Sequence, residues 1–262
     1  MTEAMRSSLS ITLSVWRALL LREALTRITG GRAPWFWLLA EPVAHIAFLT
    51  SMLTVIGHRV VGGISAVVWI VSGLLAFFFF RRTLNQGASS ISSNAALFAY
   101  RQVRPVDTVL VRVFLEGILM VLISIIVFAG LSIFGVSAFP SDPILVLLAI
   151  GGLWLLGLGG GLIFSVSIEL VPETNFVLTF LMMPLYLVSG VVLPIASVPM
   201  PYRGWLVMNP IVHGLEAAHL GFSSYYHVVP EFDLAYLYIC GLVAVFLGLA
   251  LHQRFAQRLI AK

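Results

Sequence analysis

The sequence predicts an all-α integral membrane protein, and three observations lead to this fold class. Hydrophobic residues make up 60% of the 262 residues and charged residues only 10%, which is too little charge to cover a soluble domain of this size. The mean hydropathy is +1.04. The apolar residues form long runs, each close to the ~20 residues that a helix needs to cross a bilayer. We therefore expect a single transmembrane domain over residues 1–262.

Six of these runs fit the length of a spanning helix. Trp35 and Trp37 mark an interfacial entry to the first span. Gly157 and Gly161 form a small-xxx-small pair in the fourth, which predicts close helix packing either within the chain or between two copies. The six predicted transmembrane helices cover residues 34–56, 64–84, 108–134, 144–167, 176–196 and 234–252.

The basic residues indicate the topology. All Lys and Arg residues except Arg59 and Arg203 fall on one side of the predicted spans, so both termini are expected to be cytoplasmic in a multi-pass protein. These residues are scattered at the ends of apolar runs rather than clustered on one segment, which argues against a nucleic-acid partner. Cys240 is the only cysteine, so no intrachain disulfide can form.

An interfacial helix is expected ahead of the first span, over residues 9–29. At 100° per residue, Arg17, Glu23 and Arg27 fall within one arc of about 120°, opposite an apolar face, which is the pattern of a helix lying among lipid headgroups. Arg22 breaks the pattern, because it sits among the apolar residues. It is expected to contact either a lipid phosphate or a partner.

The connection between the second and third spans, residues 94–104, is expected to hold a short helix. Asn94 is a plausible N-cap for a helix over residues 95–103, and Pro105 disfavours helical geometry at Arg104. The helix is too short to cross a membrane and lies on the basic side, so we interpret it as a rigid lever between two spans. Its expected anchors in a partner are Leu97, Phe98 and Tyr100, with Arg101 pairing with a carboxylate.

The longest external segment, residues 197–233, precedes the last span. Asn209 as N-cap, Pro210 at the first helical position and Gly221 after the last one predict a short helix. Together with another short element before it, this helix is expected to form a half-helix pair at or in the outer leaflet. His213 and Glu216 are candidate functional residues of this segment.

Ionisable residues inside the spans are a second group of candidates. Glu41 and His45 lie one turn apart in the first span, and Arg112 and Glu116 lie one turn apart in the third. Each pair is expected either to satisfy its own charges or to contact cargo or a gate. Aromatic residues, among them Trp35, Trp37, Phe78 and Tyr186, form either an interfacial belt and core or the lining of a conduit in which they stack on sugar rings.

Several catalytic signatures are absent from the sequence. It contains no Gly-x-x-x-x-Gly-Lys-Ser/Thr phosphate loop, so the chain is not expected to hydrolyse nucleotide by itself. It also lacks His-Glu-x-x-His, Cys-x-x-Cys and Gly-x-Ser-x-Gly, which leaves no visible metal or nucleophile site. An intramembrane protease or metalloenzyme therefore has no visible set of catalytic residues.

The chain resembles the permease subunit of capsular polysaccharide ABC exporters over essentially its whole length. The residues that carry the resemblance are Tyr100-Arg101-Gln102-Val103-Arg104-Pro105-Val106-Asp107-Thr108, Arg112 and Glu116, Leu21-Arg22-Glu23 with Thr26-Arg27 ahead of Glu41-Pro42, and Asn209-Pro210 with His213 and Glu216.

The resemblance implies a six-span type-2 ABC exporter permease in a bacterial inner membrane. Such a permease works as a homodimer with two copies of a separate ATPase, which holds the ATP and Mg, and no cofactor or metal is expected on this chain. Residues 94–104 correspond to the coupling helix. The implied substrate is a lipid-linked, acidic capsular polysaccharide, which Arg81 and Arg82 would attract at the inner mouth if they do not bind lipid phosphate. The implied further partners are periplasmic and outer-membrane export components.

Three alternatives stay open. Related permeases export O-antigen or teichoic acid. A secondary transporter would show internal repeats or paired broken helices, and the two halves of this sequence do not match convincingly. A membrane-embedded polymer-processing enzyme would need a catalytic cluster, for which the candidates are His213, Glu216, His219, Glu231 and Asp233.

Overall fold

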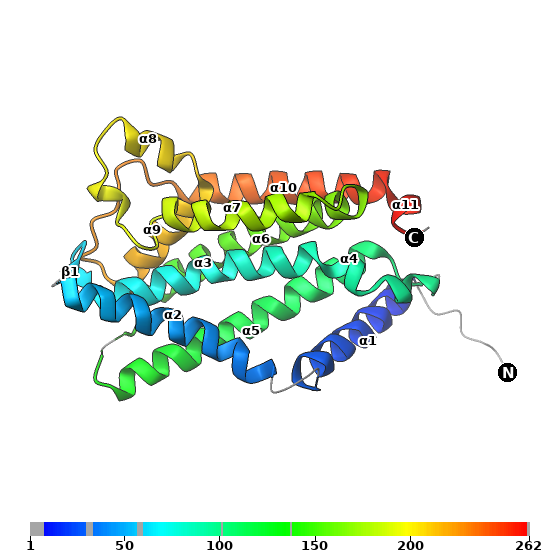
Figure 1. Ribbon diagram of the computed structural model, residues 1–262, viewed down its shortest axis with the longest axis horizontal. Coiled ribbons are helices and arrows are strands. Elements are labelled where there is room, and N and C mark those ends of the chain that lie inside the picture. The colour runs from blue at the N-terminus through cyan, green and yellow to red at the C-terminus, as the bar shows by residue number, and fades with distance from the viewer. Residues whose placement is uncertain (1–7, 30–33, 57–59, 101, 137, 261–262) are drawn as a thin grey trace.

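The computed structural model describes residues 8–29, 34–56, 60–100, 102–136 and 138–260. Long helices run side by side along the horizontal axis of Figure 1. The end of the bundle at the right of that view holds the start of α1, the short elements after α3, and α11, and we call it the α11 end. The opposite end holds β1, α8 and α9, and we call it the hairpin end.

The elements follow one another along the chain as helices with one short hairpin. The helices are α1 (Ser8–Thr29), α2 (Pro34–Ile56), α3 (Ala66–Ala88), α4 (Ser90–Ser93), α5 (Pro105–Ile133), α6 (Pro143–Leu170), α7 (Thr174–Val188), α8 (Tyr202–Val207), α9 (Pro210–Phe222), α10 (Leu234–Arg254) and α11 (Ala256–Ile260). The 3₁₀ helices are η1 (Ala95–Ala99) and η2 (Ile195–Ser197), and the strands are β1 (Val60–Val61) and β2 (Ile64–Ser65).

Four helices within the described residues, α3, α5, α6 and α10, are long and apolar enough to cross a membrane. α2 occupies the range predicted for the first span and has 23 residues. The span predicted over residues 176–196 is too long, because α7 has only 15 residues. Gly190, with φ +88°, follows the C-cap Ser189, and this left-handed conformation after a C-cap ends the helix.

Side-chain caps set several helix starts, as the sequence indicates. The Asn209 side chain accepts from the Ile211 amide at 3.1 Å, with Pro210 as the first helical residue, which confirms the predicted start of α9. Asp142 caps α6 in the same manner by accepting from the Leu145 amide at 3.0 Å. The predicted end of α9 is wrong by two residues, because Gly221 lies inside the helix, which ends at Phe222 rather than at Leu220.

The β1–β2 hairpin was not predicted from the sequence. Val60 pairs with Ser65 and Val61 with Ile64. The two connecting residues, Gly62 and Gly63, both have positive φ, 56° and 93°, which is the combination that a type I′ turn requires. The Gly-Gly pair between apolar residues is the signal that could have revealed it.

Glycines on α6 bring this helix into close contact with α3 and α10. A Cβ atom on Gly157 would lie 3.0 Å from the carbonyl oxygen of Phe80, and one on Gly161 would lie 3.1 Å from the Cα of Gly87. On another face, a Cβ on Gly159 would lie 2.5 Å from the Cβ of Ala244 on α10. The small residues of the predicted pair therefore serve packing within the chain.

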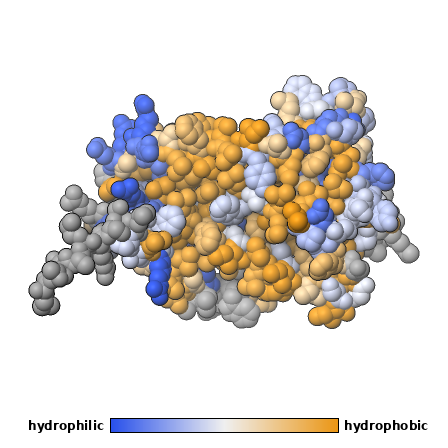
Figure 2. Space-filling model, turned by 180° about the vertical axis from the view of Figure 1, so that it is seen from behind, coloured by the Kyte–Doolittle hydropathy of each residue, from blue (hydrophilic) through white to orange (hydrophobic). Residues whose placement is uncertain are grey.

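The core is built around α3, whose aromatic and aliphatic side chains are buried all round. Trp69, Leu74, Phe77 and Phe78 are at most 1% exposed, as expected of a helix that is apolar on every face. Figure 2 shows a broad hydrophobic belt on the outside of the molecule, with hydrophilic residues gathered toward the two ends. This distribution is that of a bundle solvated by lipid along its length.

We expect Gly157→Ala to destabilise the protein by about 1–3 kcal/mol, because the added methyl overpacks the α3–α6 contact. The matched control is Gly130→Ala on α5, where an added Cβ meets no atom within 4 Å. That variant is expected to be neutral or slightly stabilising. Thermal melts of both purified proteins in the same detergent provide the comparison, and equal melting temperatures would contradict the packing argument.

Candidate functional site

Glu116, on α5, lies fully buried among positive charges from two other helices. Its Oε1 is 2.7 Å from Nε of Arg82 on α3, and its Oε2 is 3.4 Å from Nη1 of Arg27 on α1. At 1.5 Å per residue, Glu116 lies about 16 Å along α5 from Pro105. A buried carboxylate is tolerated only when it is paired in this way.

A second carboxylate, Glu23 on α1, extends the network. Its Oε1 is 3.3 Å from Nε of Arg27 and 3.0 Å from Nε of Arg112 on α5. Arg27 also donates to Oε1 of Gln86 on α3 at 2.5 Å. The Glu116 network consists of three arginines and two glutamates, Glu23, Arg27, Arg82, Arg112 and Glu116, and it ties α1 to α3 and α5 with one positive charge in excess.

The ionisable residues predicted to pair along one helix pair between helices instead. Arg112 reaches Glu23 and Glu116 reaches Arg82. Glu41 forms an ion pair with Arg81 of α3. His45 shares a hydrogen bond of 3.0 Å with the hydroxyl of Tyr186 on α7. The expectation of satisfaction within each i,i+4 pair is therefore wrong, because each side chain reaches across to a neighbouring helix.

The orientation predicted for α1 also needs correction. Glu23 and Arg27 were expected among lipid headgroups, but they turn toward α3 and α5. Leu21 and Leu25, on the predicted apolar face, are 52% and 58% exposed in the isolated chain. Figure 1 shows α1 lying obliquely beside α5. The buried charges decide this orientation, because they need partners that the bundle supplies.

The segment between α3 and α5 differs from the predicted helix over residues 95–103. It consists of α4 followed by the 3₁₀ helix η1, which ends at Ala99. Asn94 does not cap a helix through its side chain. Its Oδ1 accepts from Nη1 of Arg22 at 2.9 Å, and its Nδ2 donates to the Ser90 carbonyl at 2.8 Å. Arg22 therefore has a polar contact within the chain, and its expected contact with a lipid phosphate or a partner stays a prediction.

Pro105 begins α5 rather than only ending the preceding element. The backbone N–H of Arg104 donates to Oδ2 of Asp107 at 3.2 Å. Oδ1 of Asp107 accepts from the indole of Trp16 on α1 at 2.9 Å. The carboxylate near the start of α5 thus fixes both the incoming chain and α1.

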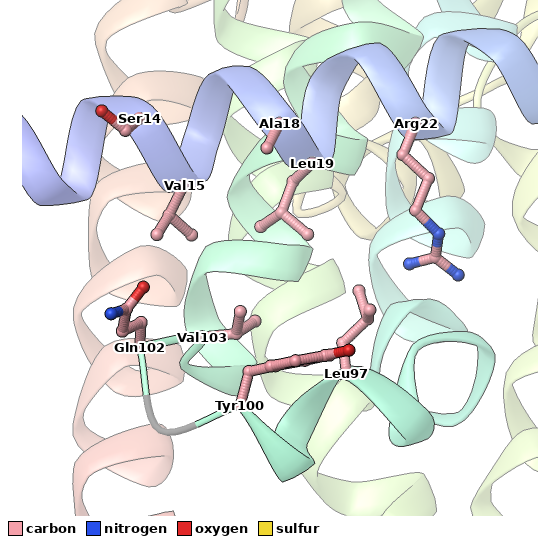
Figure 3. Close-up of a pocket in the computed structure, with 9 residues that line it drawn as sticks. All are labelled: Ser14, Val15, Ala18, Leu19, Arg22, Leu97, Tyr100, Gln102 and Val103. Atoms are coloured by element: carbon pink, nitrogen blue, oxygen red, sulfur yellow. The ribbon is translucent and has the colours of Figure 1, made fainter.

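A groove of about 470 Å³ separates α1 from this segment, and we call it the α1–η1 groove. Figure 3 shows Val15 and Leu19 pointing from α1 toward the opposite wall, which Leu97, Tyr100, Gln102 and Val103 form. Tyr100 is 67% exposed. The residues that line the groove are Ser14, Val15, Ala18, Leu19, Arg22, Leu97, Tyr100, Gln102 and Val103. The groove is therefore open to a partner at the α11 end.

Phe98, expected to be an anchor in a partner, faces inward. It is 8% exposed and belongs to a buried cluster with Val109, Val113 and Leu259. This cluster joins η1 to α5 and to the C-terminal helix α11. The other expected contact, Arg101, lies outside the described residues.

A second cavity, of about 600 Å³, lies between α2, α3 and α7. Arg81 lines it, with its guanidinium 4.6 Å from the centre of the Phe78 ring. α3 continues past Arg81 and Arg82 to Ala88, four residues beyond the predicted end of the second span at residue 84. The lining residues are His45, Phe48, Leu49, Arg81, Asn85, Ala88, Ser89, Asn175, Leu178, Thr179, Met182, Met183, Tyr186, Leu187 and Val192.

The aromatic residues predicted to line a conduit occupy different environments. Tyr186 lines the α2–α3–α7 cavity. Phe78 is fully buried, and Trp37 is 67% exposed and packs edge-to-face on Phe36. The side chain of Trp35 lies outside the described part of the chain. The sequence reasoning missed Asn175, whose position beside an apolar run was the available signal.

His213 and Glu216, expected to be candidates on an external segment, are 3% and 2% exposed within α9. Nδ1 of His213 accepts from the Asp233 amide at 3.0 Å, so its Nε2 carries the proton and donates to the Val207 carbonyl at 2.8 Å. Glu216 accepts from the Tyr226 hydroxyl at 2.9 Å and from the Val229 amide at 3.1 Å. Both side chains hold the segments that flank α9 onto this helix.

The environment of Glu216 favours its neutral form. Burial raises the pKa of its carboxyl, whereas the hydrogen bonds from Tyr226 and Val229 lower it. No group of three potential metal ligands is found among the residues that the structure describes.

Long apolar helices, a lipid-facing belt and buried charge pairs between helices define a polytopic helical membrane protein. Residues 14–222 match the model of the ABC-2 type transporter family. The chain belongs to this family and is a transporter subunit rather than an enzyme.

Relatives of known function cover nearly the whole chain. It is 34% identical over 248 residues to the polysialic acid transport protein KpsM of Escherichia coli, covering 95% of this chain and 96% of the relative. It is 30% identical over 257 residues to the capsule polysaccharide export inner-membrane protein CtrC of Neisseria meningitidis serogroup B, with coverage of 95% and 94%. It is 26% identical over 255 residues to the capsule polysaccharide export inner-membrane protein BexB of Haemophilus influenzae, with coverage of 96% and 95%. The resemblance drawn from the sequence is confirmed.

We expect Glu116→Gln to lower the free energy of unfolding by about 3–5 kcal/mol, because it leaves buried guanidinium groups without their counter-charge. Unfolding by sodium dodecyl sulfate, followed by circular dichroism, measures the loss. Glu231→Gln is the control, since Glu231 pairs with Arg203 at 3.0 Å but is partly exposed, and exposed pairs contribute little. Equal losses of unfolding free energy in the two variants would contradict the argument that burial makes the Glu116 ion pairs more costly to break.

Proposed function

We propose that this chain is the membrane-spanning subunit of an ATP-driven exporter of lipid-linked capsular polysaccharide, energised by a separate ATPase. Membership of the ABC-2 type transporter family carries this proposal. The names of the relatives, which refer to capsule polysaccharide export or polysialic acid transport, favour a capsule polymer over O-antigen or teichoic acid. The relatives named as inner-membrane proteins support the same location for this chain.

The proposed topology has six spans, with α2 and α7 added to the four long apolar helices. α2 has the length of a span, and α7 is a shorter apolar helix that continues toward η2. Arg254 and Arg258 lie at the α11 end, so the excess of positive charge supports a cytoplasmic location for that end and for both termini. The proposal includes a homodimer, because one chain offers few polar groups to a hydrated polymer.

We assign ATPase docking to the α1–η1 groove. It is open at the end that we place in the cytoplasm, and Leu97 and Tyr100 present apolar and aromatic surface to a partner. A partner that displaces η1 would move Phe98, which packs with residues of α5 and α11. Close-packed interiors transmit such displacements rather than absorbing them. The pairing of Arg101 with a carboxylate of the ATPase stays part of the proposal on the basis of the sequence alone.

The α2–α3–α7 cavity is our candidate for a part of the substrate path. Arg81 supplies a guanidinium that suits phosphate or carboxylate groups of an acidic polymer and its anchor. Tyr186 offers an aromatic face for a sugar ring, and Asn85 and Asn175 add hydrogen-bonding groups. Periplasmic and outer-membrane components would then receive the polymer.

Complementation tests the proposed function. The chain and a candidate ATPase from the same organism are expressed in an Escherichia coli strain that lacks KpsM, and surface capsule is measured with an antibody. Tagged chain is expected to copurify with the ATPase and to restore surface polymer. An intracellular polymer pool that stays unexported, although the two proteins associate, would contradict the capsule substrate. Failure to associate would contradict the ATPase coupling.

Tyr100→Ala is expected to weaken ATPase association by about tenfold or more, because it removes an exposed aromatic anchor from the docking groove. Tyr225→Ala is the control, since Tyr225 is 79% exposed at the hairpin end. Association is measured by titrating the purified ATPase onto the permease in nanodiscs. The assignment of the groove fails if both variants bind with the affinity of the wild type.

Arg81→Gln is expected to reduce export by about tenfold through loss of a charge-assisted contact with the polymer. Arg81→Lys keeps the charge and should retain most activity. Glu41→Gln keeps Arg81 but removes its ion-pair partner. This variant therefore distinguishes a contact of Arg81 with the substrate from its ion pair between α2 and α3. Surface polymer is measured at equal protein level. If Glu41→Gln impairs export as much as Arg81→Gln does, the ion pair rather than the substrate contact accounts for the loss.

A further inference from the structure

The face of α1 opposite the α1–η1 groove forms a second groove, of about 540 Å³, with α5 and α6. We call it the α1–α6 groove. Its lining comes from Leu13, Trp16, Arg17 and Leu20 of α1, Leu110, Val111 and Phe114 of α5, and Trp154 and Leu158 of α6. α1 is therefore held against the bundle by the Glu116 network on its later turns, while a hollow remains beneath its earlier turns.

The walls of this groove offer hydrocarbon and almost no polar groups. The indole N–H of Trp16 donates to Asp107, and that of Trp154 donates to the Val113 carbonyl at 3.2 Å. The indole N–H groups of both tryptophans are therefore hydrogen-bonded within the protein, and their ring carbons are the atoms that can contact an occupant. Ordered water needs 2–4 polar partners in a cavity, and these walls do not provide them.

Arg17 is the charged residue that lines the groove. Its side chain is exposed, and the ion pairs found within the described ranges use the other arginines of this region, Arg27, Arg82 and Arg112. A long arginine side chain can lie along apolar surface while its guanidinium reaches a charged headgroup. A guanidinium binds phosphate in a bidentate manner, so Arg17 complements an anionic headgroup at the edge of an apolar groove.

The depth of the groove matches the boundary between headgroups and acyl chains. Leu110 and Phe114 lie roughly 8–14 Å along α5 from its first residue, Pro105. α5 has 29 residues and is therefore longer than the ~20 residues that cross the hydrocarbon core. An occupant with a charged head at Arg17 and an apolar tail between α1 and α6 fits this level.

We propose that the α1–α6 groove binds one phospholipid of the surrounding bilayer, with an acyl chain between α1 and α6 and its phosphate on Arg17. The bound lipid fills the hollow under the first turns of α1 and supports the contact between Trp16 and Asp107. This inference does not depend on what the protein exports.

Native mass spectrometry of the purified chain tests the proposal. Protein reconstituted into phosphatidylcholine vesicles containing phosphatidylglycerol, then extracted and washed in mild detergent, is expected to retain one phospholipid per chain. Leu20→Trp fills the groove and should abolish retention. Leu25→Trp is the matched control, because Leu25 is 58% exposed on the same helix and does not line the groove. If Leu20→Trp does not fold, Leu110→Phe fills the groove from the opposite wall.

Charge variants test the headgroup contact. Arg17→Gln is expected to reduce the preference for phosphatidylglycerol by about tenfold, whereas Arg254→Gln, which changes an exposed cation elsewhere, should not. Added phosphatidylglycerol should raise the melting temperature of the wild type but not that of Leu20→Trp. The proposal is overturned if the groove-filled variants retain as much lipid as the wild type, if the wild type retains none, or if a peptide or second copy occupies the groove instead.

Discussion

The burial of Glu116 is the constraint on which the arrangement at the α11 end depends. A carboxylate with no exposed surface would cost several kcal/mol without counter-charges, and the chain supplies them from Arg82 on α3 and Arg27 on α1. Three helices must therefore keep fixed positions relative to one another. α1 cannot turn its charged side to the headgroups without removing a partner from Glu116, so the orientation of α1 follows from the network.

The position of α1 in turn creates two different grooves on its two sides. The side toward η1 is open and presents Tyr100 together with polar groups of Arg22 and Gln102. The side toward α6 is lined by hydrocarbon, with Arg17 as its charged residue. α1 thus forms one wall of each groove. The α1–η1 groove suits a protein partner, and the α1–α6 groove suits a lipid. A movement of α1 would change both.

Close packing connects these surfaces with the rest of the bundle. Gly161 of α6 approaches Gly87 on the last turns of α3, and the cluster around Phe98 joins η1 to α5, α6 and α11. Because these contacts leave little free volume, η1 and the turns of α3 and α5 that lie at the α11 end are expected to move together. At the hairpin end, the hydrogen bonds of Glu216 and His213 fix the segment after α9 on this helix, so the two ends of the molecule are held by different kinds of interaction.

The sequence by itself determined the class of the protein and the approximate ranges of its long apolar helices, because hydropathy, caps such as Asn209 and the order of the family's motifs are local properties of the chain. Only the tertiary structure decided the partners of the charges, since an i,i+4 spacing shows which side chains are near on one helix but not which neighbouring helix they reach. The same holds for Asn94, whose side chain binds Arg22 instead of capping a helix, and for Phe98, whose burial depends on Leu259 at the far end of the chain. These contacts join residues distant in sequence, so no local pattern encodes them.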